Sequence, residues 1–216
     1  MILSRGRGYI FIHIPKTGGT ALATLLEARA MKDDILVGDT PKARARRGRL
    51  AAVRTAGRLW KHSTLADLEG LVSAGEAAGL FTFTLVRNPW DRMVSYYHWL
   101  RTQGFDHPAV ALARSTSFEG FVLAPETAAS LAAWPYGRYL QEPSGAEVCR
   151  LFIRLETFAE DVAPLEQHLG FGLAPLPLVN ASDRTRDYRP FYTDSSRERV
   201  AQICAIDIAR FNYRYD

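Results

Sequence analysis

The sequence lacks several features that mark particular classes of protein. Its 216 residues include two cysteines, Cys149 and Cys204, which are too few for a disulfide scaffold. No stretch approaches the roughly 18 uncharged apolar residues of a membrane span, and the N-terminal residues have no apolar run typical of a secretory signal. We therefore expect a cytoplasmic protein without a membrane span, and the 47% of apolar residues can form a substantial core.

Acidic residues are missing from one segment, residues 41–62, which holds eight basic residues. The whole chain has a net charge of +4 and only four lysines, so arginine supplies most of the positive charge. The planar guanidinium of arginine suits phosphate and sulfate groups. The segment is therefore either a solvated surface helix or loop, or a patch that meets an anionic substrate.

Three apolar segments are predicted to form buried strands: residues 9–14, 80–86 and 148–155. Helical patterns follow them at residues 22–26, 90–97 and 158–169, the last ending at Gly170, and one more helix is expected over residues 200–211. Alternating strands and helices predict an α/β fold, a three-layer sandwich with a central parallel sheet, in a single domain spanning residues 1–216. Ligands of such sheets bind at the carboxyl ends of the strands, which here are followed by Pro15 and Arg87.

The turn after the first strand has the composition of a phosphate-binding loop. Gly18 and Gly19 permit a tight turn whose N–H groups approach an anion, and the helix behind them adds unpaired donors. Thr17 and Thr20 add hydroxyls, and Lys16 adds a positive charge. The lysine precedes the glycines, unlike in the P-loop of nucleotide triphosphatases, and the loop has room for one phosphate. The alternative is an ordinary glycine turn with an exposed lysine.

The end of the second strand has a different anion-binding pattern. Asn88 is predicted to cap the following helix and Pro89 to be its first residue. Asp91 could bond back to this cap or pair with an arginine. Arg87 would then stand at the strand end, on the helix side that carries Ser95.

These two motifs, residues 11–20 and 86–97, resemble the two phosphate-binding signatures of sulfotransferases that use 3′-phosphoadenosine 5′-phosphosulfate (PAPS). The similarity is greatest to the carbohydrate branch, which includes heparan-type uronosyl 2-O-sulfotransferases and bacterial relatives. Weaker similarity extends to residues 152–161, 180–184 and 207–213. The resemblance implies a P-loop-kinase-like sulfotransferase fold, PAPS as the donor, and no metal requirement.

The resemblance also implies residue roles. The donor's 5′-phosphate would be bound by Lys16, Thr17, Gly18, Gly19, Thr20 and Ala21, and its 3′-phosphate by Arg87 and Ser95. Arg184 and Tyr188 lie on a segment that folds near the nucleotide in relatives. Lys16 would neutralise the charge that develops on the leaving phosphate.

A hydroxyl acceptor requires a base, for which His62 is the candidate. The run Lys61-His62-Ser63-Thr64 resembles the segment that supplies the catalytic histidine in the 2-O-sulfotransferase branch, although there aromatic residues follow the histidine. The alternatives are that His62 caps a helix over residues 65–71, or that a glutamate among residues 69–76 is the base. His13, beside the phosphate loop, is expected to have a supporting role.

The acceptor is less well defined by the sequence. Residues 105–141 are expected to shape its cleft, with aromatic residues that either contact the acceptor or pack a lid. Family analogy favours a saccharide hydroxyl, and we expect no nucleic-acid partner. Two alternatives differ in class: a non-catalytic protein that binds the nucleotide or a sulfated glycan, and a P-loop-type kinase that would require ATP and magnesium.

Overall fold

The computed structural model describes residues 1–177, 185 and 187–216. The chain forms two compact units. Unit 1 comprises residues 1–86 and the described part of 136–180, and unit 2 comprises residues 87–135 and the described part of 181–216. A single domain over residues 1–216 stays a prediction.

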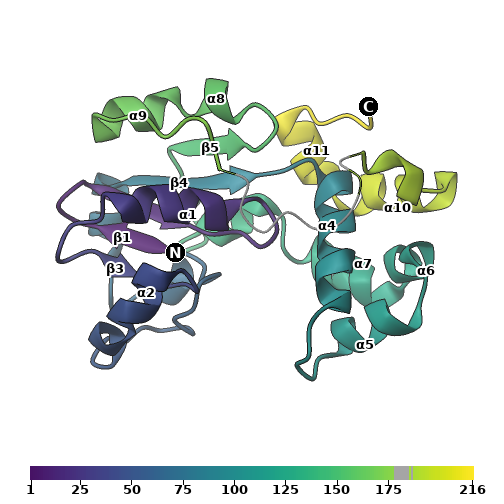
Figure 1. The fold of residues 1–216 in the computed structure, drawn as a ribbon, viewed down its shortest axis with the longest axis horizontal. Helices are drawn as coiled ribbons and strands as arrows, with labels where there is room; N and C mark the ends of the chain where they lie inside the picture. Colours follow the sequence, from purple (N-terminus) through teal and green to yellow (C-terminus); the bar gives the residue numbers. More distant parts are fainter. Residues whose placement is uncertain (178–184, 186) are drawn as a thin grey trace. The chain divides into compact units, whose positions relative to one another are not determined.

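Unit 1 contains a five-stranded sheet in the order β3-β1-β2-β4-β5 (Figure 1). Its strands are β1 (Ile2–Ser4), β2 (Tyr9–Ile12), β3 (Ile35–Leu36), β4 (Phe81–Val86) and β5 (Leu151–Arg154). The three predicted strands are present as β2, β4 and β5, and they run parallel. The sheet is nevertheless mixed, because β1 is antiparallel to both β2 and β3. A turn of four residues joins β1 to β2, and so short a connection can link only antiparallel strands.

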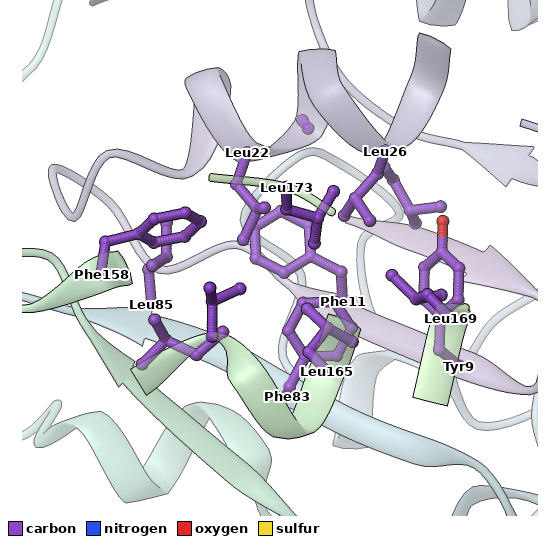
Figure 2. Packing of buried hydrophobic residues seen from close by; sticks show 14 of the residues in the cluster. Tyr9, Phe11, Leu22, Leu26, Phe83, Leu85, Phe158, Leu165, Leu169 and Leu173 are labelled. Atoms are coloured by element: carbon purple, nitrogen blue, oxygen red, sulfur yellow. The ribbon is translucent and has the colours of Figure 1, made fainter. Parts of the chain in front are cut away.

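Helices cover both faces of this sheet, which confirms the predicted α/β class. Unit 1 contains α1 (Gly19–Ala28), α2 (Pro41–Arg46), α3 (Ala74–Gly79), α8 (Phe158–Asp161), α9 (Ala163–Leu169) and the 3₁₀ helices η1 (Arg47–Leu50), η2 (Ala66–Leu68) and η3 (Tyr136–Leu140). In Figure 2, Leu22 and Leu26 of α1 point toward Phe11 of β2, within one apolar cluster. On the other face, the Thr82 hydroxyl of β4 lies 3.5 Å from the Ala77 carbonyl of α3, to which it donates.

Unit 2 is helical in its described part. It contains α4 (Pro89–Arg101), α5 (Pro108–Ser115), α6 (Phe118–Leu123), α7 (Pro125–Ala132), α10 (Asp194–Ile203), α11 (Ala205–Phe211) and the 3₁₀ helix η4 (Arg189–Phe191). Its core contains the apolar stripe predicted for α4: Trp90, Met93, Val94 and Tyr97 are all buried. The face of α4 that carries these four residues therefore packs against the interior of unit 2.

Two predicted helices are each divided in two. Residues 158–169 form α8 and α9, which meet at Val162, and Pro164 is in the first turn of α9. A proline has no N–H to continue the first helix, so a break here is expected. The helix expected over residues 200–211 is divided at Cys204 between α11 and the end of α10, which begins earlier, at Asp194. Gly170 ends α9 in the left-handed conformation, as predicted. Over the described residues, no helix combines the length and the apolar character needed to cross a membrane.

Candidate active site

The predicted phosphate-binding loop connects β2 to α1 in unit 1. Its backbone enters the left-handed region twice, at Lys16 (φ 66°) and at Gly18 (φ 87°). A lysine in this region costs of order 1 kcal/mol, and such strain concentrates at functional sites. Thr17 is fully buried, and its hydroxyl donates to the Ile14 carbonyl at 2.9 Å, which closes the turn.

The loop leaves the start of α1 suited to an anion. No side chain caps this helix, and no acidic residue lies in its first turn. The first N–H groups and the positive end of the helix dipole therefore favour a negatively charged group. A larger residue at Gly18 would force Leu155 to move, because an added Cβ would lie 2.8 Å from Leu155 Cδ1. The backbone at Gly18 is also left-handed, a conformation that residues with a side chain rarely adopt.

One histidine, His13, connects this loop to the candidate base, His62. The buried ring of His13 lies against Gly19, where an added Cβ would be 2.2 Å from His13 Cδ2. The ring centroids of His13 and His62 are 4.6 Å apart, edge to face. His62 Nδ1 lies 2.7 Å from the His13 main-chain oxygen. A carbonyl oxygen can only accept, so Nδ1 carries the proton and Nε2 holds the basic lone pair of the neutral ring.

His13 is held neutral. Burial lowers its pKa well below the ordinary value, and the nearby basic groups His62, the N-terminus, Lys61 and Lys16, in their charged forms, lower the pKa further. A neutral His13 adds no charge beside His62. The expected supporting role of His13 is consistent with these contacts. The helix expected over residues 65–71 is reduced to the single turn η2, Ala66–Leu68, and its N-cap residue is Leu65, so His62 does not cap it.

The second predicted anion site, at the start of α4, belongs to unit 2. Asn88 caps the helix as predicted, accepting from the Trp90 N–H at 3.1 Å, and its Nδ2 donates to the Arg214 carbonyl at 2.8 Å. Asp91 pairs with an arginine, one of the two predicted possibilities: its Oδ2 accepts from Arg87 Nε at 2.8 Å and from Arg87 Nη2 at 2.6 Å, which orients the guanidinium.

The other predicted nucleotide-binding residues have different surroundings. Ser95 is 6% exposed on α4. Tyr188 is also buried, and its hydroxyl donates to the Asp216 carbonyl at 3.2 Å and accepts from Asn88 Nδ2 at 3.4 Å. Burial raises the pKa of the Tyr188 phenol. Arg184 lies outside the described residues.

The basic segment, residues 41–62, forms α2, η1 and a following loop. Part of its charge is used within unit 1: Lys61 pairs with Asp39 at 2.6 Å, and Arg46 donates to the Met31 carbonyl at 2.8 Å. Arg49 donates to the Lys32 carbonyl at 2.5 Å. Other arginines of the segment are exposed: Arg44, Arg47, Arg54 and Arg58. The segment is therefore neither one helix nor a uniformly solvated loop.

The segment expected to shape the acceptor cleft, residues 105–141, contributes to both units. Tyr136 and Tyr139 are buried in unit 1, as expected if these aromatic residues pack in the core and do not contact the acceptor. Trp134, in unit 2, is 40% exposed. Sequence analysis did not single out Trp60, two residues before His62, although its position beside a candidate base was an available signal. Trp60 is 39% exposed, and its ring centroid lies 5.0 Å from that of His62.

Comparisons with known proteins give a likeness at the level of structure and none at the level of sequence. No family model and no curated protein matches the sequence. A search of solved structures found similarity to a crystal structure of the mouse sulfotransferase SULT7A1 complexed with PAP, with 14% identity over 94% of this chain and 84% of that chain, and a TM-score of 0.49. Within the described residues, no group of three or more histidine, cysteine or acidic side chains could hold a metal ion.

Proposed function

We propose that the protein is a sulfotransferase that moves a sulfuryl group from PAPS to a hydroxyl acceptor, with a saccharide as the favoured acceptor class. The main observation behind the proposal is a pair of contacts in unit 1: the His13 ring lies against Gly19, and the His13 carbonyl accepts from His62 Nδ1. His13 thus lies between an uncapped helix N-terminus and a histidine whose Nε2 is the basic nitrogen. An anion-binding loop and a base in one compact unit are the two elements that this reaction requires.

The phosphate loop fits a single phosphate group. The N–H groups at the start of α1 and the ammonium of Lys16 would bind the donor's 5′-phosphate, and the absence of acidic residues from the first turn favours this. Arg87 and Ser95 would bind the 3′-phosphate. Arg87 directly follows the last residue of β4, and β4 is the parallel neighbour of β2, the strand that precedes the loop. Arg184 and Tyr188 remain proposed nucleotide-binding residues.

The donor supplies a sulfuryl group attached to a good leaving group. The acceptor oxygen would form a bond to sulfur while the bond between sulfur and the bridging phosphate oxygen breaks. The acceptor proton would pass to His62 Nε2, and the Nδ1 bond to the His13 carbonyl would hold the ring during the transfer. Lys16 would stabilise the negative charge on the released phosphate.

A transfer assay with donor labelled in the sulfuryl group tests this proposal. Lys16→Ala and His62→Ala should both lose most of the turnover, but His62→Ala should retain its affinity for adenosine 3′,5′-bisphosphate, the desulfated product. Lys32→Ala removes an exposed lysine outside the loop and is the matched control. Full turnover by His62→Ala would show that another group is the base. Tight product binding without turnover in the unmodified protein would favour the non-catalytic alternative.

A further inference from the structure

Residues 214–216 are hydrogen-bonded to the start of α4 within unit 2. The Arg214 carbonyl accepts from Asn88 Nδ2 at 2.8 Å. The Asp216 carbonyl accepts from the Tyr188 hydroxyl at 3.2 Å, and that hydroxyl accepts in turn from Asn88 Nδ2 at 3.4 Å. We call residues 214–216 the strap, because they tie the start of α4 to Tyr188, 100 positions further along the chain than Asn88.

The strap fixes the orientation of the Asn88 side chain. This residue is buried, so its amide needs partners within the protein. Its Oδ1 accepts from the Trp90 N–H at 3.1 Å and caps α4. Its Nδ2 has two acceptors, the Arg214 carbonyl and the Tyr188 hydroxyl. Loss of the strap would remove one of these acceptors from a buried amide and would thereby destabilise the cap of α4.

The ring of Tyr215 anchors the strap. It meets three aromatic rings edge to face, with the centroid of Trp90 5.5 Å away and those of Tyr188 and Tyr192 each 5.6 Å away. The guanidinium carbon of Arg197 lies 5.6 Å from the Tyr215 centroid, a cation–π distance. Edge-to-face pairs stabilise a structure beyond the apolar area that they bury. The ring therefore holds the strap against α4, α10 and the residues that precede α10.

Trp90 belongs to the first turn of α4 and is bonded on two sides. Its indole N–H donates to the Arg197 carbonyl at 3.0 Å, and its carbonyl accepts from the Tyr192 hydroxyl at 2.9 Å. The next residue, Asp91, accepts from Arg87 Nε and Nη2 and so orients the guanidinium. The strap therefore contacts the same helical turn whose Asp91 sets the direction of Arg87.

We propose that Tyr215 is a positioning residue for the donor's 3′-phosphate: through the strap it holds the first turn of α4, and Arg87 with it, in the conformation that binds this phosphate. The inference rests on the proposed function, because it takes Arg87 as the residue that binds the 3′-phosphate. Tyr215 would act through Arg87 and not by contact with the nucleotide. Its contribution should therefore appear in the affinity for nucleotides that carry a 3′-phosphate, and not for those that lack one.

Calorimetry on Tyr215 variants tests the inference, with adenosine 3′,5′-bisphosphate and adenosine 5′-monophosphate as the probes. Tyr215→Ala should weaken the binding of the bisphosphate about tenfold, which corresponds to one hydrogen bond to a charged group, and should change the affinity for the monophosphate less than about twofold. Tyr215→Phe keeps the ring and loses only the hydroxyl, which donates to the Arg189 carbonyl at 3.1 Å. This variant should retain most of the preference for the bisphosphate.

Two further variants separate positioning from general stability. In an Arg87→Ala background, Tyr215→Ala should cause no further loss of bisphosphate affinity, because the residue through which it acts is gone. Ser117→Ala removes the cap of α6 in the same unit, where the Ser117 hydroxyl accepts from the Gly120 N–H at 3.1 Å, and should leave the ratio of the two affinities unchanged. Equal losses for both nucleotides in Tyr215→Ala, or a changed ratio in Ser117→Ala, would overturn the inference.

Measurements on the unmodified protein distinguish this inference from the proposed function. If adenosine 3′,5′-bisphosphate does not bind, the proposed function itself is wrong. If the bisphosphate binds more tightly than the monophosphate and Tyr215→Ala keeps that preference, only the role of Tyr215 is wrong. If the unmodified protein binds both nucleotides equally well, Arg87 does not bind the 3′-phosphate, and the inference is overturned with that assignment.

Discussion

Replacing Gly19 by alanine tests the contact between the phosphate loop and His13. The added Cβ would lie 2.2 Å from His13 Cδ2, 2.5 Å from Nε2 and 2.9 Å from Cγ, although such contacts are not normally closer than 3.0 Å. The His13 ring has little room to move, because it is buried and is bordered by the rings of Phe11 and His62. Overpacking of this kind costs about 1–3 kcal/mol, and the better helix propensity of alanine offsets at most about 1 kcal/mol.

Urea unfolding measures this cost. With a slope of about 2 kcal/mol per molar urea, a net loss of about 1–2 kcal/mol lowers the midpoint by about 0.5–1 M. Gly75→Ala is the control: Gly75 lies in α3, and nothing lies within 4 Å of its added Cβ. We expect that substitution to stabilise the protein by about 0.4–1 kcal/mol.

A double substitution identifies the cause. In a His13→Ala background the ring is gone, so Gly19→Ala should be neutral or stabilising, with a coupling free energy of about 1 kcal/mol or more. The reasoning is refuted if Gly19→Ala is tolerated as well as Gly75→Ala, or if its cost is the same with and without the His13 ring.

Three further changes have defined outcomes in unfolding experiments. The folded-state pKa of His13 lies below its unfolded value of about 6.5, so the free energy of unfolding should fall as the pH drops below about 6.5. This group should contribute up to about 1.4 kcal/mol per pH unit to that fall. The variant His13→Phe should therefore show a smaller change in stability between pH 7.5 and 5.5. Asp161→Asn should cost about 1 kcal/mol, because the Asp161 carboxylate accepts from Arg154 Nε at 2.8 Å and Nη2 at 2.9 Å; an unchanged urea midpoint would contradict this. Asn88→Ala removes the cap on the Trp90 N–H and should cost about 1–2 kcal/mol, whereas an equally stable variant would show that water replaces the cap.

The sequence predicted the parts of the fold that have local signals. The sequence predicted β2 and β4 because each is a run rich in β-branched and aromatic residues that ends at a turn, and β5 from a weaker apolar run. The Asn88 cap was predicted because asparagine is a favoured N-cap residue and the proline after it suits the first helical position. The strands β1 and β3 have three and two residues, too few to show a periodic pattern, and they exist through pairing with distant partners such as Ile2 with Phe11 and with Leu36.

The candidate site was predicted in its parts but not in its connections. The glycines of the phosphate loop are adjacent in the sequence, so a tight turn could be anticipated there, whereas the left-handed conformation of Lys16 was not predicted. The contact between His13 and His62 joins residues 49 positions apart, which no local pattern reports. The sequence allowed Asp91 to pair with an arginine or to bond back to its cap, and the preference for Arg87 depends on side-chain geometry.

The central claim is that two strand ends bind different phosphates of one nucleotide, and calorimetry with two ligands tests it most directly. Adenosine 3′,5′-bisphosphate carries both phosphates, and adenosine 5′-monophosphate lacks the one at the 3′ position. We predict that Lys16→Ala weakens the binding of both ligands, whereas Arg87→Ala weakens the binding of the bisphosphate alone. Equal losses for both ligands in Arg87→Ala, or no heat of binding with the unmodified protein, would contradict the claim.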